Sequence, residues 1–226
     1  MSSFDINPKY NEYFYKARRS SSKCGKMVMV LHEREIDNFF KTLVEDEGIP
    51  QLNRILIGIC LSGGLRISEA LSLKKEDFTM DDTGRIYGNI RVLKKYYLKY
   101  DVYRDFYVYP RLNSLLIEWL KKKKPQERVF AYRRLLKRGN YKYTPINSVS
   151  ALNAVKEFLG TNFDNHCLRH SNVSILMNEK YSDIEISKIL ELTVGMVARY
   201  AHVDVRRKMR ELYQGILDSK ENENES

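Results

Sequence analysis

The spacing of apolar residues changes twice along this chain, and this change constrains the fold more than any other feature of the sequence. From residue 31 to residue 73 apolar residues recur every three or four positions, which is typical of the buried face of a helix. Over residues 85–110 they alternate with tyrosines and charged residues, which is typical of half-buried strands. Helical spacing then returns. The sequence therefore predicts an α+β fold that is mainly α, with a small antiparallel β-sheet.

Glycines, prolines and changes of period give the bounds of the expected elements. Two strands are expected within residues 85–110, joined by the basic connection KKYYLKYD, and one short strand or helix within residues 128–143. Three helices are expected to begin at Leu31, Leu52 and Ile67. Six more are expected at residues 111–121, 144–160, 166–178, 182–190, 194–200 and 203–217.

Composition excludes several classes of protein. Apolar residues make up 43% of the 226 residues and charged residues 30%, so the chain can bury a core and is not disordered as a whole. Its apolar stretches are far shorter than the ~20 residues of a membrane span, and the N-terminus lacks the apolar region of a secretory signal. Three cysteines without a CxxC pair argue against a zinc site and a disulfide framework. We expect a cytoplasmic protein without membrane association, metal or cofactor.

The net charge favours a polyanionic partner. Lysine and arginine number 39 against 29 aspartates and glutamates, which gives a formal net charge of +10. The last nine residues, DSKENENES, contribute −3, so the rest of the chain carries +13. Such a charge suits DNA or RNA, although a generally basic protein without a nucleic-acid partner has the same composition.

Three segments follow from these patterns. Residues 1–30 form a basic, aromatic N-terminal arm, which is a DNA-touching segment, an extension docked on the domain or a solvated tail. Residues 31–217 form one domain. Residues 218–226 form an acidic tail that we expect to be disordered.

Four residues of chemical interest are ordinary when each is taken alone. Arg66 follows a Gly-Gly turn, where an arginine is usually a surface or capping residue. An H-x-x-R pair such as His166 and Arg169 occurs by chance in many helices. Tyr200 is one of 16 tyrosines. Taken in order they are more specific, because they lie in the blocks LSGGLRISEALSLKKEDF (61–78), NHCLRHS (165–171) and ARYAHV (198–203).

These three blocks resemble the catalytic domain of the tyrosine recombinases, or phage-type integrases. That family carries a G-L-R-I-S-E block, an H-x-L-R-H-S/T block and a Y-x-H-V block in this order. The two arginines lie 103 residues apart and Arg169 precedes Tyr200 by 31 residues, separations that suit the family. The resemblance covers roughly residues 31–217 and implies the helical DNA breaking-rejoining fold.

The resemblance implies a site-specific recombinase or integrase of a virus, plasmid or other mobile element. Arg66 and Arg169 would grip the scissile phosphate in forked geometry and stabilise the charge of the transition state. Tyr200 would attack phosphorus and form a 3′-phosphotyrosine intermediate, and His166 would accept a proton or contact the phosphate. Glu69 would orient Arg66.

The resemblance also implies a lysine that protonates the leaving 5′-oxygen from the turn between two strands. Lys95 in IRVLKK matches this position best, with Lys94 and Lys99 on the same connection. The alternative is that these lysines only touch the DNA backbone. Further backbone contacts are expected from a set of basic residues in the middle of the chain: Lys121, Lys122, Arg133, Arg134, Lys137 and Arg138.

One part of the family pattern is missing. The family has L-G-H before the tyrosine, and the matching stretch here is Leu190-Glu191-Leu192. A carboxylate repels a phosphate, so we expect slower cleavage, with Lys188 or His202 as conceivable substitutes. The departure keeps open a non-catalytic DNA-binding protein on the same fold. A type IB topoisomerase-like nicking-closing enzyme is the other alternative.

The resemblance implies double-stranded DNA as the partner and other protomers on DNA, as a synaptic tetramer. The expected helix at residues 203–217 is the usual site of protomer exchange in the family. The alternative is that this helix packs on its own domain.

Overall fold

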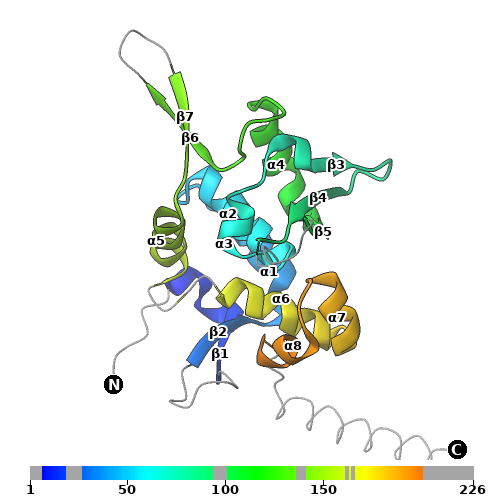
Figure 1. Ribbon diagram of the computed structural model, residues 1–226. Coiled ribbons are helices and arrows are strands. Elements are labelled where there is room, and N and C mark those ends of the chain that lie inside the picture. Colours follow the sequence, from blue (N-terminus) through cyan, green and yellow to red (C-terminus); the bar gives the residue numbers. More distant parts are fainter. Residues whose placement is uncertain are drawn as a thin grey trace, which may run out of the picture.

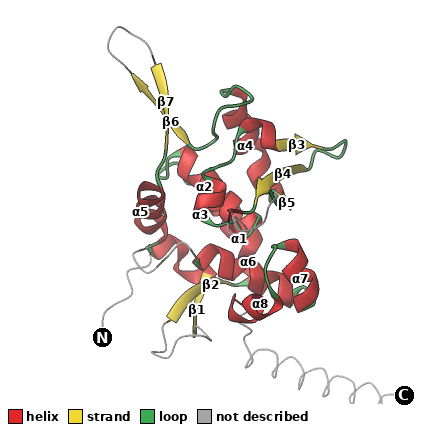
Figure 2. Cartoon of the chain, in the orientation of Figure 1, coloured by secondary structure: helices red, strands yellow, loops and turns green. Residues whose placement is uncertain are grey.

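The computed structural model describes residues 7–18, 27–93, 101–135, 141–160, 163 and 166–200. Helices form most of this part of the chain, and short antiparallel sheets lie at its margins (Figures 1 and 2). This confirms the expected α+β class with a helical majority. The expected helix at residues 203–217 and the acidic tail lie outside the described residues.

The helical core is built around α2, whose residues from Leu52 to Leu61 are almost all apolar and all buried apart from Arg54. Such a helix is hydrophobic on every side and needs neighbours all round. It receives them from α1, α4, α5 and α6. The helices are α1 (Ile36–Glu45), α2 (Gln51–Ser62), α3 (Ile67–Ala70), α4 (Asn113–Lys121), α5 (Ser148–Leu159), α6 (Cys167–Asn178), α7 (Asp183–Ile189) and α8 (Val194–Tyr200).

No helix in the described part of the chain combines the length and the apolar character that crossing a membrane requires.

The expected central sheet is present and gains a third strand. Its strands are β3 (Phe78–Met80), β4 (Ile86–Arg91) and β5 (Tyr103–Tyr107), in that order and antiparallel. β4 pairs with β5 so that Ile90 lies opposite Arg104, and both side chains point to the buried face. β3 was not expected from the sequence because three residues are too few to establish a period.

The hairpin formed by residues 131–145 differs from the sequence-based prediction. β6 (Ala131–Leu135) pairs with β7 (Tyr141–Pro145), where one short element was expected, and the hairpin extends away from the helices (Figure 1). The prediction that Thr144-Pro145 begins a helix is wrong, because both residues belong to β7. α5 begins at Ser148 instead, since the Asn147 side chain accepts a hydrogen bond from the Ser150 N–H and caps the helix.

The helix expected from Leu31 begins five residues later, at Ile36. Leu31 ends β2 (Met27–Leu31), which pairs with β1 (Phe14–Arg18). The Leu31 N–H donates to the Ser171 hydroxyl at 2.9 Å, so the strand is fixed on α6 by a buried hydrogen bond. A run of consecutive apolar residues fits a helix or a strand equally well, and this tertiary contact favours the strand.

The N-terminal segment is docked on the helical core. Tyr10, Tyr13 and Phe14 are buried, and Phe14 makes edge-to-face contacts with Phe39 and Phe163 at centroid distances of 5.5 and 4.8 Å. Such contacts stabilise beyond the area they bury. From residue 7 to residue 18 the chain therefore follows the docked alternative among those considered for the arm.

Candidate active site

The turn between α2 and α3 delivers Arg66 to the centre of the domain. Gly64 has φ +56°, and a Cβ added there would lie 2.5 Å from the Asn172 side-chain oxygen. Only glycine fits a position with this φ and this close neighbour. Asn172 in turn donates to the carbonyls of Leu61 and Ser62 at 2.9 and 3.0 Å, which holds the end of α2 on α6. Gly64 of the first motif block is thus a structural requirement.

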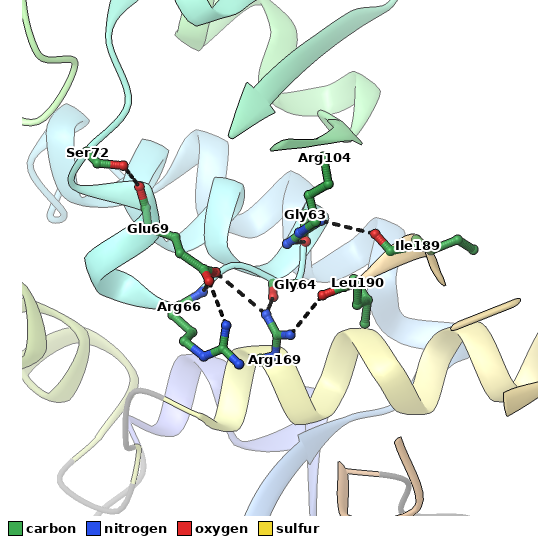
Figure 3. Close-up of polar contacts among 9 residues, drawn as sticks. All are labelled: Gly63, Gly64, Arg66, Glu69, Ser72, Arg104, Arg169, Ile189 and Leu190. Carbon is green, nitrogen blue, oxygen red and sulfur yellow. Dashed lines mark hydrogen bonds and ion pairs between the residues drawn. The ribbon is translucent and has the colours of Figure 1, made fainter. Parts of the chain in front are cut away.

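Glu69 connects the two arginines that the sequence singled out (Figure 3). Its Oε2 accepts a hydrogen bond from the backbone N–H of Arg66 at 2.9 Å, and its Oε1 accepts one from Arg66 Nη1 at 2.6 Å. Arg169 Nη1 lies 3.7 Å from Glu69 Oε2. Arg66 is 8% exposed, Glu69 1% and Arg169 0%, so the three charges lie in a low-dielectric interior where they interact strongly.

Arg169 also binds two backbone carbonyls. Its Nη1 donates to the Gly64 carbonyl at 2.5 Å and its Nη2 to the Leu190 carbonyl at 3.2 Å. These bonds replace the water that a buried guanidinium loses. Arg169 therefore fastens the turn before Arg66 to the segment between α7 and α8.

Arg66 keeps hydrogen-bonding capacity that the described residues do not use. Its buried Nε has no hydrogen-bond partner among them. Two guanidinium groups that meet at one carboxylate are of the chemical type that binds an oxyanion such as a phosphate.

His166 and Tyr200 lie at the ends of two helices that pack on each other, α6 and α8. His166 is the residue before α6, and its i,i+3 spacing to Arg169 places both on one helix face. Tyr200 is the last residue of α8, and its side chain lies outside the described part of the structure. α8 packs on α6 and α7 through Val197, Val173 and Ile186. The backbone of the candidate nucleophile therefore belongs to the same helical layer as Arg169.

The stretch matching L-G-H is the turn that follows α7. Glu191 adopts a left-handed conformation with φ +49°, directly after Leu190, whose carbonyl is bound by Arg169. Lys188, one of the conceivable substitutes, is exposed on α7, and His202 lies outside the described residues.

A residue that the sequence did not single out, Arg104 on β5, binds the same region. It is 7% exposed, and its Nη2 donates to the Gly63 carbonyl at 2.9 Å. The sequence did contain a signal for the burial of Arg104, because this residue alternates with Phe106 and Val108 at inward positions. A charged residue in such a row needs a buried partner.

Several residues with expected roles lie outside the described residues: Lys94, Lys95, Lys99, Lys137 and Arg138. Arg133 and Arg134 have a described backbone in β6 but no described side chain. Lys121 and Lys122 are exposed at the end of α4, and Lys122 pairs with Glu118 at 2.7 Å. In the described residues no group of three or more His, Cys, Asp or Glu is arranged to hold a metal ion.

Lys123 lies among these basic residues but is buried. It donates to the Ala131 carbonyl at 3.2 Å and lies 4.9 Å from the Trp119 ring centroid. Burial lowers the pKa of its amine. Its charge therefore faces the protein interior and not a DNA backbone.

Comparison with known proteins decides the family. The model of the phage integrase family matches residues 29–207. The chain belongs to this family. This confirms the resemblance drawn from the three motif blocks, and the match contains Arg66, Arg169 and Tyr200.

Known relatives of this phage integrase family member include transposase A from transposon Tn554 of Staphylococcus aureus, 25% identical over 169 residues. The alignment covers 73% of this chain and 45% of the transposase, so the chain spans less than half of that relative's length.

Solved structures share the fold. XerA recombinase matches with a TM-score of 0.59 and 17% identity, over 82% of this chain and 62% of its own. XerH site-specific recombinase, bound to its palindromic difH substrate after cleavage, matches with a TM-score of 0.58 and 24% identity, over 81% and 51%. The Tn1549 transposon integrase, in complex with circular intermediate DNA, matches with a TM-score of 0.52 and 19% identity, over 81% and 64%.

Proposed function

We propose that this protein is a site-specific DNA recombinase or integrase that cleaves and rejoins DNA through a 3′-phosphotyrosine intermediate. The observation that carries the proposal is the meeting of Arg66 and Arg169 at the Glu69 carboxylate. Family membership supports it, and so do the DNA-bound states of XerH and the Tn1549 integrase. Double-stranded DNA is accordingly the proposed partner, and the cytoplasm the proposed place of action.

Each proposed step uses a residue of this chain. The two arginines hold the non-bridging oxygens of one phosphodiester and stabilise the charge that gathers on them in the transition state. The Tyr200 oxygen attacks phosphorus while its proton passes to His166. The bond to the 5′-oxygen breaks, and Lys95 supplies the proton that makes a 5′-hydroxyl. The reverse sequence, with a 5′-hydroxyl of another strand, rejoins the DNA.

This chemistry is proposed to proceed without a metal ion. Guanidinium groups already provide the positive charge that a cation would bring to the phosphate. Cleavage that is unchanged by a chelator supports this part of the proposal, and cleavage that stops until a divalent cation is added contradicts it.

The basic residues outside the site are proposed to bind the DNA backbone. The β6–β7 hairpin extends from the body (Figure 1), and its sequence RRLLKRGNYKY carries five of the basic residues. Phosphate contacts of this kind position a protein without reading sequence. Assembly into a synaptic tetramer on DNA is part of the same proposal.

The decisive test is covalent capture of DNA. Duplexes with a random core, each with a nick that lets the cleaved strand diffuse away, are incubated with the protein and denatured. We expect a protein–DNA adduct from the unsubstituted chain and none from Tyr200→Phe. DNA binding without an adduct from any duplex would leave only the non-catalytic alternative.

The products separate the two enzymatic alternatives. With captured sequences built into plasmids, a recombinase exchanges strands between two sites. A nicking-closing enzyme relaxes supercoils at one site and exchanges nothing.

A further inference from the structure

Arg104 is a third buried arginine beside the cluster of Arg66, Glu69 and Arg169, and it belongs to none of the three motif blocks. Its Nη2 donates to the Gly63 carbonyl at 2.9 Å, and its Nη1 lies 3.5 Å from the Ile189 carbonyl. A cation this deeply buried persists only where polar groups replace its lost water. Chance therefore does not account for a buried arginine at position 104.

Arg104 and Arg169 join the same two segments through neighbouring residues (Figure 3). Each arginine has as partners one carbonyl of the α2–α3 turn and one carbonyl at the C-terminal end of α7 or directly after it. The carbonyls are those of Gly63 and Ile189 for Arg104, and of Gly64 and Leu190 for Arg169. One segment leads to Arg66 and the other leads to α8, which ends at Tyr200. The two guanidiniums therefore fix the spacing between these segments.

Glu191 brings a negative charge to the same turn. It follows directly on the two carbonyls that the arginines contact. Burial lowers the pKa of Arg104, and the charge of Arg66 lowers it too, while the carboxylates of Glu69 and, to a smaller extent, Glu191 act in the opposite direction. Arginine remains charged at any working pH. Arg104 thus places a permanent positive charge within electrostatic reach of Glu191, a carboxylate that by itself would repel a phosphate held by Arg66 and Arg169.

We propose that Arg104 is a positioning residue of the strand-transfer site: it ties the α7–α8 turn to the α2–α3 turn and offsets the charge of Glu191. It acts through these neighbours and does not itself touch DNA. The proposal rests on the proposed function for the identity of the anion. The interaction between Arg104 and Glu191 stands without it and is tested separately.

The first experiment measures that interaction without DNA. Urea unfolding is followed for the unsubstituted chain, Arg104→Met, Glu191→Gln and the double variant. We expect Arg104→Met to raise the unfolding equilibrium constant and Glu191→Gln to reverse part of that rise, with a coupling of about threefold or more. Strictly additive effects would show that Arg104 does not offset Glu191 and would overturn the proposal.

The second experiment measures adduct formation and DNA affinity for the same variants. We expect Arg104→Met to slow adduct formation about tenfold or more, with affinity changed less than about threefold, and Glu191→Gln to restore part of the rate. A residue that only supports the fold would give no such rescue. Arg85→Met, which removes an exposed arginine from the turn between β3 and β4, is the matched control and should leave the rate unchanged.

The outcomes are separable. An unsubstituted chain that forms no adduct contradicts the proposed function, whereas the unfolding measurements still decide the coupling. An adduct rate that falls without rescue by Glu191→Gln, or equally with Arg85→Met, overturns the role of Arg104 and leaves the proposed function intact.

Discussion

Arg66 and Arg169 reach the same buried carboxylate although 103 residues separate them in the chain. Arg66 Nη1 lies 2.6 Å from Glu69 Oε1, and Arg169 Nη1 lies 3.7 Å from Glu69 Oε2. Two like charges repel at this range, so the carboxylate between them makes the arrangement stable in the absence of substrate. Glu69 thus holds together the arginine pair that is proposed to bind the phosphate.

The first prediction concerns Glu69. Glu69→Gln keeps the shape of the side chain and removes the charge that holds both arginines. Because it leaves buried charges without their partner, we expect a loss of about 3–5 kcal/mol in the free energy of unfolding, measured in urea. The adduct rate should fall as well. Glu76→Gln, at an exposed position paired with Lys74, is the control and should change stability by less than about 0.5 kcal/mol.

The second prediction separates cleavage from binding at Arg169. Arg169→Lys keeps a positive charge but loses the fork that holds two carbonyls and faces the carboxylate. We expect adduct formation to fall by about two orders of magnitude or more while DNA affinity falls only a few-fold, since the forked guanidinium is proposed to act mainly in the transition state. Equal losses of rate and affinity would contradict the assignment. Thermal unfolding of the variant must accompany the measurement, because the side chain is fully buried.

The order of the three motif blocks predicted the arginine pair through the resemblance to the family. Arg66 and Glu69 lie three residues apart, so their contact also follows from helix geometry. The contact of Arg169 with this pair did not follow from spacing and came only from the family resemblance. Arg104 shows the limit more clearly. Period two predicts that it points inward, but its partners at Gly63 and Ile189 are 41 and 85 residues away.

The two N-terminal strands show why local pattern alone misplaces elements. The run MVMVL has no polar residue to mark a face, so strand and helix are equally compatible with it. Pairing with β1 and the bond from the Leu31 N–H to Ser171 select the strand, and both are long-range contacts. The start of α5 shows the opposite case, since the Asn147 cap was a local signal three residues beyond Thr144.

The third prediction concerns the basic hairpin. Replacing its basic residues by glutamine should weaken DNA binding and flatten the salt dependence, with the slope of log affinity against log salt falling by about 0.9 for each phosphate that the variant no longer neutralises. The five residues are Arg133, Arg134, Lys137, Arg138 and Lys142. Lys9→Gln, at an exposed lysine paired with Asp46, controls for a general loss of charge. An unchanged slope in the hairpin variant would show that the hairpin does not bind the DNA backbone.

The fourth prediction concerns the docking of the N-terminal segment. Phe14→Ala removes a ring that packs on Phe39 and Phe163, and we expect a loss of about 3–5 kcal/mol in the free energy of unfolding. Tyr132→Ala, which removes a ring that is 52% exposed, should cost far less. If both substitutions have equally small effects on urea unfolding, the segment contributes nothing to the stability of the core.

The last prediction concerns alkaline pH and Tyr10. Burial raises the pKa of the Tyr10 phenol, and the hydrogen bond that it donates to Asp46 Oδ2 at 2.9 Å raises it further. A pKa raised by folding stabilises the protein fully below the unfolded value of about 10 and progressively less as pH rises above it. The stability advantage of the unsubstituted chain over Tyr10→Phe should therefore be constant up to about pH 9 and then shrink by up to about 1.4 kcal/mol per pH unit.

Urea unfolding of both proteins between about pH 7 and 11 measures this difference. Because the other 15 tyrosines are common to both chains, their ionisation cancels in the comparison. A difference that stays constant over the whole range would show that the Tyr10 phenol ionises in the folded protein as it does in the unfolded chain.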